Sequence, residues 1–297
     1  MVAKMRKMIK RRYRIFIGRF FPKKLANTLY IERTGKHDGI NWNHPMDLNE
    51  KINWLKFNTD TSIWTALADK YAVRKYISEK GYEDILVQLY GVWQSPDEID
   101  FTALPNKFVL KTNNGAGTVW VIRDKKSTDL NKLKEQLQRA LKIRFGVESA
   151  EPHYLKIEPR IIAEELLEEN NSFSTSLVDY KVWCFRGKVF ATWCCYNRNG
   201  FEADTEWHDL NWDFRPEWSV FTDHYKNGHG RVSCPSSYNR MLEIASNLSE
   251  RFPQVRIDFY NVNGKVYFGE MTFTCAGGYM NFYSQEVLNI MGRMTII

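Results

Sequence analysis

The sequence predicts an α+β protein, because two kinds of hydrophobic periodicity occur in different segments of the same chain. From Val255 to Thr272, apolar and polar residues alternate, as they do in strands with one buried face. From Leu130 to Leu141, leucines recur at helical spacing. A length of 297 residues suits one large domain or two closely joined lobes, and the apolar content is sufficient for a core.

The positive charge of the chain is concentrated at its beginning. Residues 1–24 hold five Lys and five Arg without an acid, and subtracting these ten charges from the formal +7 leaves −3 for the remainder. The apolar residues of this segment lie at helical spacing: Met5, Met8, Ile9, Tyr13, Phe16, Ile17 and Phe20. A basic amphipathic helix is therefore expected within residues 1–30, and it can lie on an anionic membrane surface. Packing against the protein body and contact with nucleic acid are the alternatives. We expect no nucleic-acid partner, because no DNA- or RNA-binding signature follows.

The cysteines indicate a reducing compartment. Their number is odd, and none has the spacing of a zinc ligand: Cys184, Cys194, Cys195, Cys234 and Cys275. No apolar run approaches the ~20 residues needed to span a bilayer, and no secretory signal is recognisable. A cytoplasmic protein is expected, with peripheral association at the inner face of the membrane through residues 1–24.

Two helices are predicted ahead of the first strands. Asp47 and Glu50 have the spacing of a capping box, which predicts that a helix begins there. A second helix is predicted from Thr61 to Glu79, and it carries Lys70 and Arg74. Taken alone, these charges indicate a solvated helix face.

A glycine-containing loop follows one of the next two predicted strands, Ile85–Leu89 and Phe108–Lys111. The second strand places Lys111 at its end, and the loop consists of Asn113, Asn114, Gly115, Ala116 and Gly117. Backbone N–H groups exposed beside a fixed ammonium can bind an anion. The alternative is an ordinary hairpin turn, and the loop is not a Walker motif because no Gly-Lys-Ser/Thr follows.

A third marker is an apolar strand that begins at Arg160 and runs into two acids before returning to apolar residues. These residues are Glu164, Glu165, Leu166 and Leu167. In an ordinary sheet such acids end a strand and face water. A helix is expected before this strand, over residues 127–143.

The segment from Asp179 to Tyr196 is predicted to be a hairpin that turns at Arg186-Gly187 and holds Lys181 among aromatic residues. A buried cation is costly unless it is paired, so Lys181 either reaches solvent or binds a phosphate. Residues 199–233 are aromatic and irregular, and helices are expected over residues 238–251 and 284–291.

The hairpin from Val255 to Thr272 carries the strongest candidate site, formed by Arg256, Asp258 and Glu270. A two-residue turn at Asn263-Gly264 would send Glu270 to the face opposite Asp258, whereas a three-residue loop would place both acids on one face. We predict the three-residue loop, because two acids and an Arg on one face form a site for a hard cation. The alternative is a surface hairpin whose acids are solvated or neutralised by Arg256.

Taken together and in this order, the motifs resemble the ATP-grasp amidoligase-type family associated with teichuronopeptide and capsular polysaccharide biosynthesis, the TupA-like proteins. The motifs are LNEKINWLK, LADKYAVRKYI, LYGVW, DEIDF, FVLK with its glycine loop, PRIIAEELL, DYKVWCFRGK and VRIDFYNVNGKVYFGEMTFT. The resemblance covers roughly residues 40–297. It implies an ATP-grasp fold with two α+β lobes that grip ATP between them. The N-terminal helical segment, residues 1–30, is followed by a pre-grasp region (31–105), a small lobe (106–165) and a large lobe with the metal site (166–297).

The resemblance also implies roles for particular residues. Lys70, Arg74, Lys111, Lys181 and the glycine loop would hold the ATP phosphates. The linker at residues 164–167 would meet adenine, with an acid around 164–169 on the ribose. Asp258 and Glu270 would bind Mg²⁺. Thr272 stands where D-alanine ligase-like members have Asn, so its role as a third ligand is the weakest part of the match.

The reaction that this resemblance implies is a Mg²⁺-ATP-dependent carboxylate–amine ligation through an acyl phosphate, with Arg256 on the oxyanion. An acidic sugar or peptide acid would be the acceptor, and an amino acid would supply the amine. One alternative is a phosphotransferase acting on a sugar hydroxyl. Another is a non-catalytic, membrane-associated carbohydrate-binding protein.

Overall fold

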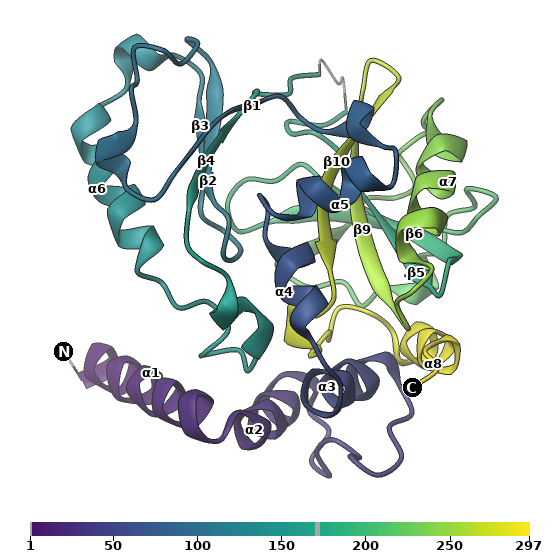
Figure 1. The fold of residues 1–297 in the computed structure, drawn as a ribbon. Coiled ribbons are helices and arrows are strands. Elements are labelled where there is room, and N and C mark those ends of the chain that lie inside the picture. Colours follow the sequence, from purple (N-terminus) through teal and green to yellow (C-terminus); the bar gives the residue numbers. More distant parts are fainter. Residues whose placement is uncertain (1, 170–172) are drawn as a thin grey trace. The chain divides into compact units, whose positions relative to one another are not determined.

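The computed structural model describes residues 2–169 and 173–297, which form two compact units (Figure 1). The first unit contains the described parts of residues 1–26, 60–76 and 87–167. The second contains those of residues 27–59, 77–86 and 168–297. Each unit is built around one sheet, of four and six strands respectively.

The sheet of the first unit is antiparallel, with strand order β1-β4-β2-β3. Its strands are β1 (Leu89–Trp93), β2 (Phe108–Thr112), β3 (Val119–Ile122) and β4 (Ile161–Glu164). Helix α6 (Leu130–Leu141) buries Leu133 and Leu137 in one core cluster with Phe108 and Ile161 of the sheet. The leucine spacing that predicted this helix therefore forms its buried face.

The basic N-terminal segment forms two helices, α1 (Val2–Phe20) and α2 (Pro22–Thr34). The helix predicted within residues 1–30 is interrupted at Phe21, because proline disfavours the α conformation in the residue before it and is well suited to begin a helix. Gly18 lies so close to Val147 that an added Cβ would come within 1.9 Å of the Val147 carbonyl oxygen. Only glycine allows α1 to approach the chain there.

The helix predicted from Thr61 to Glu79 is wrong, because two helices occur there: α4 (Ser62–Ala68) and α5 (Val73–Glu79). Asp69 separates them, since its carboxylate accepts hydrogen bonds from the backbone N–H groups of Tyr71 (2.8 Å) and Ala72 (3.2 Å). The predicted strand at Ile85–Leu89 is also wrong. A 3₁₀ turn occupies Glu83–Ile85, and β1 begins only at Leu89.

The sheet of the second unit has strand order β10-β9-β5-β6-β7-β8 and is antiparallel except for the β7–β8 pair. Its strands are β5 (Asp179–Phe185), β6 (Lys188–Tyr196), β7 (Ala203–His208), β8 (Tyr225–Asn227), β9 (Val255–Val262) and β10 (Lys265–Thr272). The β5–β6 hairpin turns at Arg186-Gly187, as predicted. Strands β7 and β8 lie in the stretch expected to be irregular. In β7, buried Glu206 and His208 pair at 3.0 Å. The strand therefore has polar residues at buried positions, where apolar residues would have indicated a strand.

Three helices lie wholly within the second unit: α3 (Leu48–Asn58), α7 (Tyr238–Ser249) and α8 (Gln285–Met294). Asp47 caps α3 by accepting the Glu50 N–H at 2.9 Å, which confirms the predicted start of this helix. Trp183, Trp193 and Trp207 form an aromatic core with residues of α3 and α8. No helix in the described part of the chain has both the length and the apolar character needed to cross a membrane.

Short 3₁₀ segments connect several of these elements. They lie at Pro96–Glu98, Lys125–Ser127, Pro152–Lys156, Pro216–Trp218 and Cys275–Gly277.

Candidate active site

The β9–β10 hairpin places its two acids on one face, but by a different route from the predicted one. Val262 pairs with Lys265, so Asn263-Gly264 form a two-residue turn in which both φ angles are positive (51° and 80°). The predicted three-residue loop is therefore wrong. The register then shifts between Phe268 and Glu270, which makes Gly269 a β-bulge and brings Glu270 directly opposite Asp258.

Glycine is required at the bulge because the two strands approach closely. A Cβ on Gly269 would lie 2.9 Å from the carbonyl oxygen of Asp258. Without the shift, Asp258 would pair with Gly269, and the side chain of Glu270 would point to the opposite face. The bulge, and not the turn, therefore places the two acids on one face.

Arg256 binds both carboxylates of this face. Its Nε and Nη2 donate to the two oxygens of Asp258, each at 2.7 Å, and Nη2 also donates to Glu270 Oε1 at 3.1 Å. The Thr272 hydroxyl donates to the same Glu270 oxygen at 3.0 Å. The two acids therefore share one face, as predicted, and Arg256 neutralises Asp258, while the predicted cation site itself stays a prediction.

Lys181 reaches the same cluster from β5, which pairs with β9 so that Lys181 lies opposite Asp258. Its ammonium is 2.5 Å from Asp258 Oδ2 and 3.1 Å from Asp179 Oδ2. Although burial opposes the charged form, Asp179 and Asp258 raise the pKa of Lys181 above its ordinary value. Arg198 also pairs with Asp179. Lys181 is thus a buried, charged lysine held by two carboxylates.

The side chains on this face suit Mg²⁺ by the chemistry of their donor atoms. Mg²⁺ at nucleotide sites is held by one or two carboxylates together with phosphate oxygens, and Asp258, Glu270 and Thr272 offer two carboxylates and a hydroxyl. Among the residues that the structure describes, no group of three or more His, Cys, Asp and Glu side chains could hold a metal ion. Both oxygens of Asp258 bind Arg256 or Lys181, so metal binding requires Asp258 to exchange one cation for another.

In the first unit, three of the predicted phosphate-binding cations lie around Glu164 and the glycine loop. Lys111 Nζ is 2.5 Å from one oxygen of buried Glu164, and Arg74 Nη1 is 3.4 Å from the other. Lys70 Nζ donates to the Gly115 carbonyl at 2.5 Å. The side chains of Lys111 and Arg74 remain 20% and 18% exposed.

The glycine loop is closed at its base by paired threonines. The Thr112 N–H donates to the Thr118 carbonyl at 3.2 Å, and the two hydroxyl oxygens are 2.6 Å apart. The side chains of Asn113 and Asn114 are buried, whereas Ala116 and Gly117 are exposed. The tip of the loop therefore offers backbone rather than side-chain groups to an anion.

The linker predicted to meet adenine begins where β4 ends. The Glu165 N–H donates to the Gln88 carbonyl at 2.9 Å, its side chain is exposed, and Leu166 and Leu167 are partly buried. Glu164 anchors Lys111 and Arg74. That use makes Glu165 and later acids the better candidates for a ribose contact.

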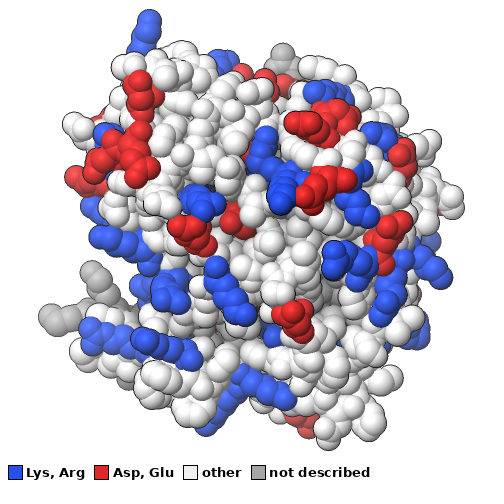
Figure 2. Space-filling model, viewed as in Figure 1, with Lys and Arg blue, Asp and Glu red and all other residues white. Residues whose placement is uncertain are grey.

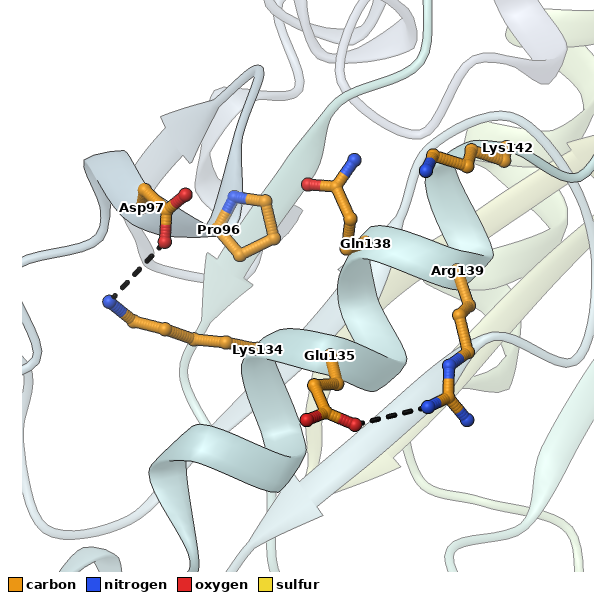
Figure 3. A pocket seen from close by; sticks show the side chains of 7 residues that line it. All are labelled: Pro96, Asp97, Lys134, Glu135, Gln138, Arg139 and Lys142. Carbon is orange, nitrogen blue, oxygen red and sulfur yellow. Dashed lines mark hydrogen bonds and ion pairs between the residues drawn. The ribbon is translucent and has the colours of Figure 1, made fainter.

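A pocket of about 380 Å³ lies elsewhere on the first unit (Figure 3). It is lined by Pro96, Asp97, Lys134, Glu135, Gln138, Arg139 and Lys142. The Lys134–Asp97 pair (3.8 Å) and the Arg139–Glu135 pair (3.0 Å) neutralise much of its charge. None of the described residues predicted for the nucleotide site is among those that line it, and we assign it no catalytic role.

Two features near the predicted residues were missed. Asp179 holds both Lys181 and Arg198, and the alternation of strand faces could have placed Asp179 on the same face as Lys181. Cys275 lies beside Arg256, with its sulfur 3.0 Å from Nη1. Its place beyond the end of β10 gave no sequence signal.

Two α+β units, one carrying a lysine and a glycine loop and the other paired acids on neighbouring strands, define a protein of the ATP-grasp class. The chain belongs to the TupA-like ATPgrasp family, whose model matches residues 50–296. This membership confirms the predicted family, the predicted fold and the assignment as an ATP-grasp enzyme.

Solved structures to which the chain is similar include the D-alanine–D-alanine ligase of Bacillus anthracis (13% identity, 84% of this chain and 70% of that chain, TM-score 0.47). The L-amino acid ligase of Bacillus licheniformis is also similar (12% identity, 78% of this chain and 50% of that chain, TM-score 0.44). The chain thus spans between half and 70% of the length of these two proteins. No curated protein is similar enough in sequence to count as a match.

Proposed function

We propose that this protein is a Mg²⁺-ATP-dependent carboxylate–amine ligase. The observation that carries the proposal is the convergence of Asp258, Glu270 and Arg256 on one face of β9 and β10. Two carboxylates opposite each other repel unless a cation lies with them, a role that Arg256 fills in this structure and that Mg²⁺ would share. An arginine in the same cluster adds a group that can stabilise a developing oxyanion.

In the first unit, Lys70, Arg74 and Lys111 bind the phosphates of ATP. Lys111 and Arg74 share Glu164, and Lys70 lies on the backbone of the glycine loop. A group of cations of this kind favours a polyanion. The exposed backbone at Ala116 and Gly117 supplies further N–H groups. Residues of the linker, from Glu165 onward, meet the nucleoside.

In the second unit, Asp258 and Glu270 would hold Mg²⁺, with Thr272 as a further oxygen donor. Mg²⁺ would supply charge neutralisation for phosphoryl transfer. Lys181 and Arg256 then exchange Asp258 for substrate oxygens: Lys181 binds a phosphate, and Arg256 binds the oxygen of the activated acyl group.

The proposed reaction has two steps. A substrate carboxylate oxygen attacks the γ-phosphorus, which forms a C–O–P linkage and breaks the bond to ADP. The amine nitrogen then attacks the acyl carbon, which forms an amide, releases phosphate and loses a proton. The family resemblance supports an acidic sugar or peptide acid as acceptor and an amino acid as the amine, in the biosynthesis of a cell-surface polysaccharide.

Incubation with ATP, Mg²⁺, a uronate sugar and a set of amino acids tests this reaction. ADP release that requires both the acid and the amine is expected. Transfer of labelled phosphate to the sugar without an amine would favour a phosphotransferase. A protein that does not bind ATP in the presence of Mg²⁺ would instead favour a carbohydrate-binding role without catalysis.

We also propose that the enzyme works at an anionic membrane surface through α1 and the start of α2. Seven large apolar side chains of this segment are each 51–57% exposed: Met5, Met8, Ile9, Tyr13, Phe16, Phe20 and Phe21. Figure 2 shows basic side chains along the same helix, at the lower left. Apolar side chains that enter the headgroup region and cations that meet anionic lipid bind such a surface together.

Sedimentation with vesicles tests this surface. Phe16→Ser with Phe20→Ser should weaken binding of the full chain to vesicles rich in phosphatidylglycerol. Phe201→Ser, which removes an even more exposed aromatic of the second unit, should not. The proposal would be excluded if the natural chain, the double variant and the Phe201→Ser variant bound these vesicles equally. It would also be excluded if the natural chain bound neutral vesicles equally well.

A further inference from the structure

We infer that Asp69 and Asn113 are a positioning pair that fixes the glycine loop to the turn carrying Lys70. This inference rests on the proposed function and deepens it. It also gives Asn113 a different role from the direct nucleotide contact predicted from the sequence.

Asn113 is the first residue after β2 and is fully buried. Its side-chain amide donates to Asp69 Oδ1 (2.9 Å) and to the Glu158 carbonyl (3.0 Å), and its oxygen accepts the Arg160 N–H (2.7 Å). Its backbone N–H donates to the Arg160 carbonyl at 3.1 Å. Both amide hydrogens and the amide oxygen are therefore used within the protein, and the side chain ties three segments together.

Asp69 completes the connection from the other side. Its Oδ1 accepts three hydrogen bonds, from the Asn113 side chain and from the N–H groups of Tyr71 and Ala72. These bonds end α4 and fix the turn that leads into α5. Asp69 is only 6% exposed, so its hydrogen bonds are made within the protein.

Lys70 lies between these two anchors and depends on both. Its backbone N–H donates to the Asn113 carbonyl at 3.4 Å, and its ammonium donates to the Gly115 carbonyl at 2.5 Å. Arg74 follows one turn later and reaches Glu164, which also holds Lys111. A change at the Asp69–Asn113 contact should therefore move Lys70 first.

Asn113→Asp is the sharpest perturbation, because it keeps the shape and the acceptor for Arg160. It replaces the amide nitrogen, which donates to Asp69 Oδ1 and to the Glu158 carbonyl, with an oxygen that repels both acceptors. Loss of a buried charge-assisted hydrogen bond commonly corresponds to about a tenfold change in an equilibrium constant or more. We expect the dissociation constant for Mg²⁺-ATP, measured by calorimetry, to rise at least about tenfold.

The decisive measurement is the same substitution in a Lys70→Ala background. If Asn113 acts by positioning Lys70, Asn113→Asp should have little further effect on ATP binding once Lys70 is gone. An equal loss in both backgrounds, or unchanged binding in the single variant, would overturn the inference. Asp69→Asn with Asn113→Asp should recover part of the affinity, since the pair can then hydrogen-bond with reversed polarity.

Two further measurements keep the test decisive. Asp69→Asn alone preserves the shape and serves if Asn113→Asp does not fold. We expect Asp69→Asn to weaken ATP binding less than Asn113→Asp does, and to have no further effect in the Lys70→Ala background. An additive loss of ATP affinity in that background would contradict the inference. Amide hydrogen exchange at residues 114–118, measured without nucleotide, should be faster in either variant. If the natural chain does not bind ATP at all, the proposed function fails, and this exchange measurement still decides whether the pair holds the loop.

Discussion

Asp258→Ala should lower the stability of the second unit as well as remove turnover, whereas Glu270→Ala should remove turnover with little change in stability. Asp258 is 1% exposed, and its two oxygens accept from Arg256 at 2.7 Å and from Lys181 at 2.5 Å. Its removal leaves two buried cations with fewer partners. Breaking a buried ion pair in this way costs about 3–5 kcal/mol.

The lower end of that range applies here because each cation keeps another carboxylate. Lys181 remains 3.1 Å from Asp179, and Arg256 remains 3.1 Å from Glu270. A loss of about 3 kcal/mol corresponds to a fall in the melting temperature of roughly 6–12 °C for a unit of this size. The side chain of Glu270 is 40% exposed, so its loss should cost below about 1 kcal/mol and only a few degrees.

Thermal unfolding monitored by fluorescence, together with ATP turnover, checks both variants. Glu250→Ala is a matched control, since Glu250 is 62% exposed in its pair with Lys80 and should change neither quantity. An Asp258→Ala protein as stable as the natural chain would refute the buried charge network. Retained turnover in both active-site variants would refute the metal assignment.

Three further predictions concern the bulge, the phosphate cations and pH. Gly269→Ala should lower stability by about 1–3 kcal/mol and reduce turnover, because its Cβ would lie 2.9 Å from the Asp258 carbonyl oxygen. Thermal unfolding measures the loss of stability, and ADP release measures the loss of turnover. Lys111→Met should raise KM for ATP by about tenfold or more, with a smaller change in kcat, because a cation that binds phosphate is lost. Glu164 keeps Arg74 as a partner in this variant. An unchanged KM in steady-state kinetics would contradict the prediction. The pKa of Lys181 is raised, so its contribution to stability is present below about pH 10 and is lost as the pH rises through its folded-state pKa. Lys181→Met should therefore remove part of the loss of stability that urea unfolding shows at alkaline pH. Asp179, whose pKa is lowered by Lys181 and Arg198 against the effect of burial, should contribute stability above about pH 4 that is lost in acid.

The sequence carried enough information for the strands that bear the candidate site, but not for their register. Alternation placed Arg256 and Asp258 on one face of β9. The Asn-Gly pair correctly indicated a hairpin, and a glycine within a strand is itself a sign of a bulge. The prediction attributed the convergence of Asp258 and Glu270 to the turn and overlooked Gly269, so it was correct for the shared face and wrong for its cause.

Contacts between distant segments account for what the sequence could not provide. Lys181 and Asp258 are 77 positions apart and meet only because β5 pairs with β9. Asp69, whose bonds to the Tyr71 and Ala72 N–H groups interrupt a helical pattern, also binds Asn113, a residue 44 positions away. In β7, Glu206 is buried with four hydrogen-bond donors around it, so the strand lacks the apolar pattern by which strands are recognised.

The bulge at Gly269 also separates the tip of the hairpin from its acids. Residues 265–268 pair with β9 in one register and residues 270–272 in another, so the alignment of Glu270 with Asp258 is set next to them and not at the turn. Lengthening the chain at Asn263-Gly264 should therefore leave the two acids facing each other. A regular ladder that kept Gly269 in register would instead turn Glu270 to the opposite face, whereas deleting Gly269 should leave Glu270 opposite Asp258. This division makes the tip a place for a fused tag or reporter, because the alignment of the acids is set locally at residues 268–270.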